Sequence, residues 1–319
     1  MNSIGFGTWS WGNKILWGYQ AHKDDEELEK TFNIAIKNGI NLIDTADSYG
    51  IGQLNGQSEK LLGEFLAKIP PSRRKRITVA TKLAPFPWRL GRNGFRDAFK
   101  SSKERLQGKL DRVQLHWSTY RYAPWQELQL LDGLSDLLDE GLVPEIGISN
   151  MGPKRLKWVH NYLQKRGIPI TSLQIQFSLI SPQPKKTFEL IELCKDLNIQ
   201  FLAYSPLALG ILSIPPGTNK YKGTYLRRSI YKRLIPCTEK LRKELNNISN
   251  RRKVSQSQVA LNWCRYHGAI PIPGIRKSYQ AKDIAYTSKW KLTKIEANSL
   301  DIFSKNCLKR MPNNPFQSN

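Results

Sequence analysis

Residues 24–50 read DDEELEKTFNIAIKNGINLIDTADSYG and combine the signals of one helix and one strand. Four acidic residues open the stretch, where they complement the dipole of a helix. Apolar side chains recur at helical spacing from Leu28 to Ile36, and Asn38-Gly39 is a typical helix end. The short apolar run Asn41–Asp44 then has the length of a buried strand. The stretch therefore predicts a helix that packs its apolar face against a sheet.

The same alternation continues along the whole chain. Short apolar runs bounded by turn residues predict eight strands, at Ile4–Thr8, Asn41–Asp44, Ile77–Thr81, Arg112–His116, Val143–Ser149, Ser172–Phe177, Gln200–Tyr204 and Ala269–Ile272. Helical segments lie between them, for example after Gly152-Pro153. Repeated strand–helix units predict a parallel sheet, and eight units favour a closed (β/α)₈ TIM barrel. We therefore expect a single barrel domain over residues 1–319.

An open, doubly wound α/β sheet is the alternative architecture. Its Gly-x-Gly-x-x-Gly fingerprint is matched only in part by Gly5–Ser10, and no helix pattern follows directly. Residues 209–236 interrupt the alternation with Pro215-Pro216-Gly217 and a basic, tyrosine-rich run. We expect a long loop without regular structure there. Because it follows the seventh strand, it would lie over the active face of a barrel as a lid or binding loop, and a disordered segment is the alternative.

The chain is strongly basic, with 50 Lys and Arg against 26 Asp and Glu and a net charge of +24. These side chains are scattered along the sequence, which favours a solvated basic surface. An anionic substrate and nucleic-acid binding are the alternatives, but no basic stripe with interleaved aromatics is present. We therefore expect no specific nucleic-acid partner. Nothing in the sequence fixes the oligomeric state.

The cysteines indicate a reducing compartment. Cys194, Cys237, Cys264 and Cys307 lie far apart in the sequence, with no Cys-x-x-Cys spacing. We expect neither a metal site nor a disulfide framework. No run of 18 apolar residues and no leader-like opening is found, so we expect a cytoplasmic protein without a membrane partner.

Four titratable residues lie at the ends of three neighbouring predicted strands. Asp44 ends the second strand, and Tyr49 lies in the loop after it. Lys82 ends the third strand and His116 the fourth. Because barrel enzymes carry their catalytic groups at these strand ends, we expect one pocket. Each residue alone is equally consistent with a helix cap, a solvated charge or packing, and only their joint position indicates a site.

These four residue types suit the reduction of a carbonyl by hydride transfer. The reaction leaves a negative oxygen, which Tyr49 would protonate. Tyrosine is a weak acid with an ordinary pKa near ~10, and an adjacent Lys82 ammonium would lower that pKa. Asp44 would keep Lys82 charged and in place. A neutral His116 would donate a hydrogen bond to the carbonyl oxygen, and a bound cofactor would carry the hydride.

Three motifs, in this order, give the chain a resemblance to the aldo-keto reductase family. They are Asn41–Gly50 followed by Ser58–Gly63, then Val79–Lys82, then Asp111–Trp117. The resemblance runs from Gly5 to about Asp301. It implies a barrel enzyme that reduces small carbonyl substrates with NADPH (NADP+ in its oxidised form), with Asp44, Tyr49, Lys82 and His116 as catalytic residues. Many members begin with a hairpin that plugs the barrel, and here we expect that plug to be short or absent.

The resemblance also implies residues that contact the cofactor. Ser149 and Asn150, in the segment Gly147–Asn150, and Gln174 would hold the nicotinamide carboxamide. Tyr204 would stack on the nicotinamide ring, unless it is only packed in the core. The residues Ser205, Pro206 and Leu207 would reach the pyrophosphate.

At the other end of the cofactor, Arg276 and Lys277 would grip the 2′-phosphate, which suits a guanidinium fork and a point charge. Gln280 and Asp283 match the positions that follow. Family members usually have Glu-Asn where this chain has Asp283-Ile284, which puts one adenine contact in doubt. The first loop, with Gly7, Thr8 and Trp9, would complete the cofactor site at the pocket mouth or simply pack there.

Aromatic residues near the expected mouth favour a compact aromatic aldehyde as substrate. They are Trp9, Trp11, Trp17, Trp117, Tyr221, Tyr225 and Tyr231. The segments around Trp11 and Trp290 also resemble plant-plastid and cyanobacterial members, some of them pyridoxal reductases. A broad reductase of small reactive aldehydes is the alternative. A cofactor-binding regulatory subunit, like potassium-channel β subunits, is a further one, but the presence of all four catalytic residues favours an enzyme.

Overall fold

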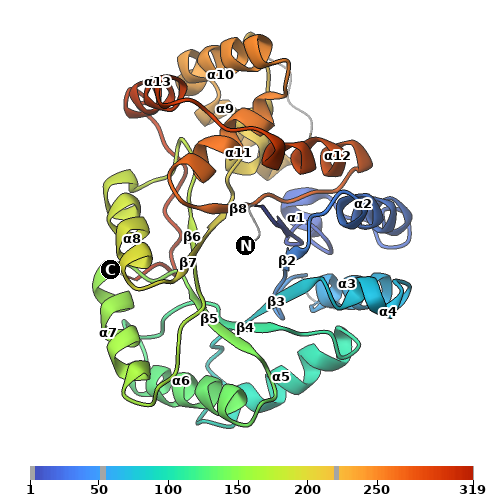
Figure 1. The fold of residues 1–319 in the computed structure, drawn as a ribbon, viewed down its shortest axis with the longest axis vertical. Helices are drawn as coiled ribbons and strands as arrows, with labels where there is room; N and C mark the ends of the chain where they lie inside the picture. The colour runs from blue at the N-terminus through green and yellow to red at the C-terminus, as the bar shows by residue number, and fades with distance from the viewer. Residues whose placement is uncertain (1–3, 51–54, 219–222, 319) are drawn as a thin grey trace.

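The computed structural model describes residues 4–50, 55–218 and 223–318, and eight parallel strands form the barrel at its centre (Figure 1). The strands are β1 Phe6–Gly7, β2 Leu42–Asp44, β3 Thr78–Leu83, β4 Arg112–Leu115, β5 Glu145–Ser149, β6 Ser172–Gln176, β7 Gln200–Tyr204 and β8 Ile270–Ile272. Each pairs with the next in sequence. The amides of Gly5 and Gly7 donate to Pro271 and Pro273 at 3.0 Å and close the ring. The predicted barrel is confirmed, and the open sheet is wrong.

Helices surround the barrel on all sides in Figure 1. They are α1 Lys14–Trp17, α2 Asp25–Lys37, α3 Gln57–Ala67, α4 Pro71–Arg74, α5 Gly94–Arg105, α6 Pro124–Asp139, α7 Pro153–Gln164, α8 Pro184–Asp196, α9 Tyr225–Leu234, α10 Glu239–Arg252, α11 Gln256–Tyr266, α12 Ser278–Tyr286 and α13 Lys294–Lys305. Helix α2 has the predicted form, with Leu28, Phe32 and Ile36 buried. It ends where Gly39 takes a φ of 85°, a conformation that glycine adopts without strain.

The apolar core lies mainly between the strands and the helices. A smaller cluster of Leu42, Leu202 and Ile272, with Tyr204 against it, joins β2, β7 and β8. Because side chains alternate along a strand, Asp44 lies on the same side of β2 as Leu42. The polar residue at the strand end thus follows directly on an apolar layer. The interior of the barrel is therefore filled with side chains, and the polar residues that could take part in a reaction lie at its carboxyl end.

The prediction of a structureless loop over residues 209–236 is wrong. The segment starts within a 3₁₀ turn, Ala208–Ser213, contains helix α9, and ends at a second 3₁₀ turn, Pro236–Thr238. Thr224 caps α9 by accepting from the Arg227 amide, and Tyr231 and Leu234 are its buried residues. Because α9 buries only these two side chains and carries several basic residues, its helical periodicity is not evident from the sequence. Helix α9 packs against α1, whereas residues 219–222 lie outside the described part of the chain.

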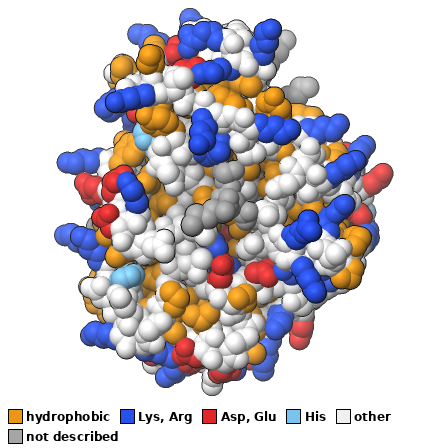
Figure 2. All heavy atoms as spheres, in the orientation of Figure 1, with side chains coloured by type: hydrophobic (Ala, Val, Ile, Leu, Met, Phe, Trp, Pro, Cys, Tyr) orange, Lys and Arg blue, Asp and Glu red, His pale blue; other side chains and the backbone are white. Residues whose placement is uncertain are grey.

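Basic side chains are spread around the rim of the face seen in Figure 2, with acidic side chains between them. On this face they form no single stripe. Of the helices in the described residues, none is both long enough and apolar enough to cross a membrane. The four cysteines are all free thiols.

Candidate active site

Asp44 and Lys82, at neighbouring strand ends, form a buried ion pair. The Lys82 Nζ lies 2.5 Å from the Asp44 Oδ2 and 2.7 Å from the Thr45 carbonyl oxygen. Burial by itself lowers the pKa of Lys82, but the charge of Asp44, together with hydrogen bonds to Asp44 and Tyr49, outweighs it, and the net pKa is raised. Lys82 therefore keeps its positive charge in the interior.

Two glutamines hold the other oxygen of Asp44. Gln174 on β6 donates to Oδ1 at 2.7 Å, and Gln114 on β4 donates to it at 3.1 Å. Gln174, which the sequence predicts at the nicotinamide, orients Asp44 through its side-chain amide nitrogen. Gln114 was not predicted. The signal for it was present, because Gln114 lies two residues before His116 and so points to the same side of the strand.

Tyr49 lies between Lys82 and His116. Lys82 Nζ is 4.8 Å from the centre of the Tyr49 ring, and the His116 ring is 5.9 Å from it in an edge-to-face arrangement. Burial raises the pKa of Tyr49, and the ammonium of Lys82 lowers it by less. The expected influence of Lys82 is present, but the net shift is upward, opposite to the prediction, because desolvation of the phenolate is the larger effect.

His116 is neutral, as expected. Burial lowers its pKa well below 6.5, and the positive charges of Lys82 and Arg89 act in the same direction. Its Nδ1 lies 3.2 Å from the Ser48 hydroxyl. Arg89 also pairs with Asp47, a buried carboxylate that accepts from the Ala84 amide. Sequence reasoning missed this pair, whose charges act on Tyr49 and His116.

The residues expected at the nicotinamide gather beside His116. Asn150 donates from Nδ2 to the His116 carbonyl oxygen at 3.0 Å and accepts from the Tyr204 hydroxyl at 2.9 Å. Ser149 donates to the Gln174 carbonyl oxygen at 3.0 Å. In the same motif, a side chain on Gly147 would lie 2.5 Å from the Ser172 hydroxyl, so the close approach of β5 to β6 requires glycine there.

The segment that follows α13 crosses this group of residues. The Asn314 amide donates to Asn150 Oδ1 at 2.9 Å and to the Tyr204 hydroxyl at 2.8 Å. Phe316 stacks on Trp117 with ring centres 4.5 Å apart. No signal in the sequence marks these residues, because their partners lie more than a hundred positions away and carry no motif in common with them.

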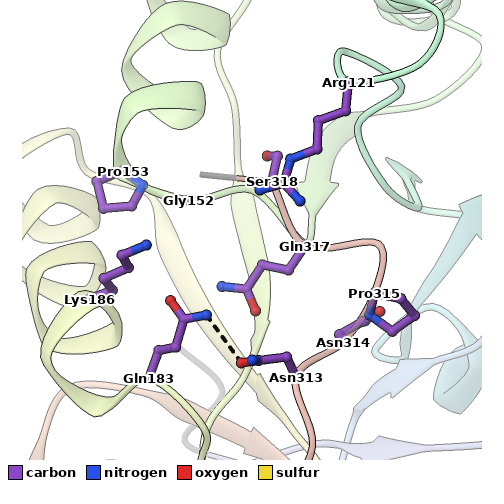
Figure 3. A pocket seen from close by; sticks show the side chains of 10 residues that line it. All are labelled: Arg121, Gly152, Pro153, Gln183, Lys186, Asn313, Asn314, Pro315, Gln317 and Ser318. Atoms are coloured by element: carbon purple, nitrogen blue, oxygen red, sulfur yellow. Dashed lines mark hydrogen bonds between the residues drawn. The ribbon is translucent and has the colours of Figure 1, made fainter.

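A cavity of about 190 Å³ opens beside this segment (Figure 3). It is lined by residues 313–315, 317 and 318, by Arg121, and by the first residues of α7 and α8. Asn314 links the cavity to Asn150 and Tyr204. The four catalytic candidates are not in its lining, so the cavity is distinct from the proposed reaction centre.

The candidates for the phosphate end of the cofactor follow β7 and β8. Ser205, Pro206 and Leu207 lead into the 3₁₀ turn, and Ser205 has a φ of 49°. Gln280 Oε1 accepts from the amides of Arg276 and Lys277 at 2.8 and 3.1 Å and so shapes their loop.

Arg276 and Asp283 have partners within the protein. The Arg276 guanidinium donates to the Trp17 carbonyl oxygen and to Asp24. The Asp283 carboxylate accepts from Ser255 and Gln258, both at 2.6 Å, which ties α12 to α11.

The first loop has some residues in the core and others at the surface. Gly7 lies in β1, and the Thr8 hydroxyl accepts from Ser58 at 2.6 Å. Trp9 is 39% exposed and lies edge-to-face with Trp17 at 6.2 Å.

The aromatic wall predicted for the pocket mouth is partly wrong. Trp11 is fully buried and donates to the Ile275 carbonyl oxygen at 2.8 Å, so it belongs to the core. Tyr231 is also buried, with its hydroxyl on the Leu209 carbonyl oxygen. Tyr225 is 82% exposed, and Tyr221 lies outside the described residues.

Comparison with known proteins gives a consistent result. Residues 3–305 match the Aldo/keto reductase family. An Arabidopsis thaliana protein named chloroplastic pyridoxal reductase is 44% identical over 325 residues, which cover 100% of this chain and 87% of the relative. Among solved structures, a glycerol dehydrogenase from Gluconobacter oxydans has a TM-score of 0.77 at 24% identity, over 98% of this chain and 94% of that one. An aldo-keto reductase from Klebsiella pneumoniae in complex with NADPH has a TM-score of 0.71 at 22% identity, over 99% and 94%.

Proposed function

The chain belongs to the aldo/keto reductase family and is an oxidoreductase that acts on carbonyl groups, and we propose that it reduces small aldehydes with NADPH, with Tyr49 as the proton donor. One observation carries the proposal. Lys82 lies 2.5 Å from Asp44 and 4.8 Å from the centre of the Tyr49 ring, beside a neutral His116. A protonated phenol, a fixed ammonium and a neutral imidazole are the groups that a developing alkoxide requires.

Each residue has a distinct part in the proposed reaction. NADPH supplies the hydride when bound. Tyr49 delivers its phenolic proton to the carbonyl oxygen, and Lys82 stabilises the phenolate that remains. Ser48 can donate to His116 Nδ1, which leaves the hydrogen of the neutral ring on Nε2. From Nε2, His116 donates to the same carbonyl oxygen and polarises it.

The residues beside this centre fit the proposed cofactor. Among the residues that the structure describes, the buried Arg276 Nε finds no hydrogen-bond partner, which suits a phosphate oxygen. We propose that Arg276 and Lys277 hold the 2′-phosphate of NADPH, and that Ser149, Asn150 and Tyr204 hold its nicotinamide. Because both oxygens of Asp283 are bound by α11, we propose that Asp283 positions α12 and does not contact the adenine.

Pyridoxal is the substrate that we propose to test first. The Arabidopsis relative is named a pyridoxal reductase. Beside His116, Trp117 stacks on Phe316, and Phe86 stacks on Trp88 at 4.6 Å. Aromatic walls of this kind favour a flat ring. Methylglyoxal serves as the comparison, because a general reductase of small aldehydes would prefer it or treat both alike.

Replacement of the proton donor tests the function. Tyr49→Phe should lower kcat for pyridoxal by about 10² to 10⁴. It should leave the Kd for NADPH, followed by the quench of tryptophan fluorescence, near the wild-type value, because the phenol does not hold the cofactor. Tyr279→Phe, at a side chain that is 69% exposed, is the matched control and should change neither quantity. Near-normal turnover by Tyr49→Phe would contradict the mechanism.

We further propose a reducing compartment, because all four cysteines are free. The cytoplasm is the proposed location, and the name of the Arabidopsis relative makes the plastid the alternative. Imaging of a tagged full-length chain in its native cells would decide between them.

A further inference from the structure

Three buried nitrogen donors at the carboxyl end of the barrel have no hydrogen-bond partner within the described residues. They are Nε1 of Trp17, Nε of Arg227 and Nε of Arg276. Trp17 ends α1 after β1, Arg227 lies in α9 after β7, and Arg276 follows β8. Because β7, β8 and β1 are neighbours in the closed barrel, the three donors come from adjacent strand ends.

Direct contacts join these residues into one cluster. The Arg227 guanidinium lies over the Trp17 ring, 4.5 Å from its centre. Arg276 donates from Nη1 to the Trp17 carbonyl oxygen. Thr224, the cap of α9, donates to the Leu16 carbonyl oxygen at 3.0 Å and holds α9 against α1. Helix α9 therefore brings Arg227 to a place where the sequence predicted only a loop.

The cluster contains two guanidinium groups, and Asp24 beside it can neutralise only one of them. Asp24 lies 3.1 Å from Arg276 Nη2. Burial lowers the pKa of Arg276, and the charge of Arg227 lowers it further against the opposite influence of Asp24. The Arg227 guanidinium also donates from Nη2 to the Leu209 carbonyl oxygen at 3.0 Å and lies 5.1 Å from the centre of the Tyr231 ring, and neither group is negatively charged. Buried donors without acceptors and an excess of positive charge both indicate a missing anion.

We infer that Arg227, Trp17 and Arg276 form one phosphate-binding site, in which Arg227 is a second guanidinium that holds a phosphoryl group of the dinucleotide cofactor. The inference rests on the proposed function and adds Arg227 and Trp17 to it. A phosphoryl group offers several acceptor oxygens to donors from different directions, and arginine matches it with a planar fork. Barrels also commonly place phosphate in the loops after their seventh and eighth strands.

Binding measurements on the full chain test the site without reference to turnover. Titrations use NADPH, NADH, adenosine 2′,5′-bisphosphate and ADP, followed by calorimetry and by tryptophan fluorescence. Arg227→Ala should weaken NADPH about ten- to a hundredfold, the range for one lost hydrogen bond to a charged group. Trp17→Phe, which keeps the ring under Arg227 and removes only the Nε1 hydrogen, should weaken it about two- to tenfold.

Arg228→Ala is the matched control, because it removes the same charge from the next, exposed residue of α9. It should leave all four affinities close to wild type. Arg227→Gln keeps most of the aliphatic stem of Arg227 and a polar end group, so it is a milder replacement for α9 than Arg227→Ala. Circular dichroism and thermal unfolding of each variant establish that the helix is intact. Arg227→Gln should lose as much NADPH affinity as Arg227→Ala.

The four ligands also locate the phosphoryl group. Loss confined to NADPH and the 2′,5′-bisphosphate would place Arg227 on the 2′-phosphate, and equal loss for NADPH, NADH and ADP would place it on the pyrophosphate. Both results support the site. Wild-type affinity of folded Arg227→Gln for all four ligands, or a loss no larger than that of Arg228→Ala, would overturn it. Pyridoxal turnover measured in parallel separates the two proposals, since Arg227-dependent binding without turnover would retain the site and reject the function.

Discussion

Tyr49 and His116 are both kept neutral by burial, whereas Lys82 stays charged because Asp44 lies 2.5 Å from its Nζ. The charges in the site act on one another, but desolvation is the largest influence on each of the three groups. Of these three groups, only Lys82 has a buried carboxylate within hydrogen-bond distance, and that carboxylate offsets the effect of desolvation on its pKa. The protonation pattern that reduction requires therefore depends on how these residues are packed as much as on their type.

The pH dependence of reduction follows from these directions. His116 has a pKa well below 6.5, so it remains a neutral donor as the pH rises through that value. Tyr49 has a raised pKa, so its proton is lost only at alkaline pH. We expect kcat/KM for pyridoxal reduction to show no inflection near pH 6.5 and to fall on the alkaline side. If kcat/KM of the wild type instead rises through pH 6.5, and this rise is absent from the His116→Gln variant, the assignment is contradicted.

The Asp44–Lys82 pair should also matter for folding. Asp44→Asn leaves the Lys82 ammonium buried without its counter-charge, which typically costs about 3–5 kcal/mol of unfolding free energy. The double variant Asp44→Asn with Lys82→Met removes both charges and should recover part of that loss. Urea unfolding at pH 7 measures both variants. A double variant less stable than Asp44→Asn would show that the pair contributes by another route.

Among the elements, helix α13 shows how a local motif and a distant contact act together. Thr293 accepts from the Glu296 amide, and Glu296 accepts from the Thr293 amide, as in a capping box. Arg252 at the end of α10 forms two hydrogen bonds of 2.8 Å to the same carboxylate. The capping box can be recognised in the sequence, but the contact with Arg252 forms only because α10 packs against α13.

This cluster predicts a pH-dependent stability. Hydrogen bonds from Arg252 and Thr293 lower the pKa of Glu296 to about 2 from an ordinary value of 4.5. A carboxyl with a lowered folded-state pKa stabilises the protein above its unfolded pKa, and this contribution is lost as the pH falls from about 4.5 towards 2. Glu296→Gln should cost about 1–2 kcal/mol at pH 7.

Denaturant unfolding of the wild type and Glu296→Gln at pH 7, 4 and 2.5 measures the effect. The difference between the two proteins should shrink as the pH falls. Glu189→Gln, at an exposed residue of α8, is the control and should show no such trend. A difference that stays constant with pH would show that lost packing, and not the carboxylate charge, is responsible.

Across the whole molecule, the segment after α13 joins the last residues of the chain to strands in its middle. Met311 donates from its amide to Ile180, Asn314 contacts Asn150 and Tyr204, and Phe316 covers Trp117. In Figure 1 this segment passes from α13 to the side of the barrel near α8. It thus completes the wall beside the proposed nicotinamide and substrate positions.

Shortening of two side chains in this segment should have separable effects. Asn314→Ala removes two hydrogen bonds that fix Asn150 and Tyr204, and should weaken NADPH about two- to tenfold. Phe316→Ala removes a stacked ring and should raise KM for pyridoxal about two- to tenfold, with little change for methylglyoxal. Leu308→Ala, at a side chain 93% exposed, is the control. Equal changes in KM for both aldehydes would contradict an aromatic wall at Phe316.

Local patterns were sufficient to predict the barrel and to group the residues of the proposed reaction centre. All eight predicted strands are present because a buried parallel strand is a short apolar run with turn residues at its ends, and each such run is visible over a few residues. Asp44, Lys82 and His116 could be grouped because equivalent ends of parallel strands meet at one end of a barrel. Their placement needs the order of the strands but no side-chain coordinates.

The remaining features depend on contacts that no short stretch of sequence contains. The net direction of the Tyr49 pKa shift follows from its burial, which many residues create together. Trp11 belongs to the core because Phe6, Phe65 and Ile275 surround it. Helix α9 has only a narrow buried face, and Asn314 reaches Asn150 across 164 positions. Sequence patterns repeat with the period of a helix or strand and therefore report one element, whereas burial and long-range hydrogen bonds arise only when the elements are packed together.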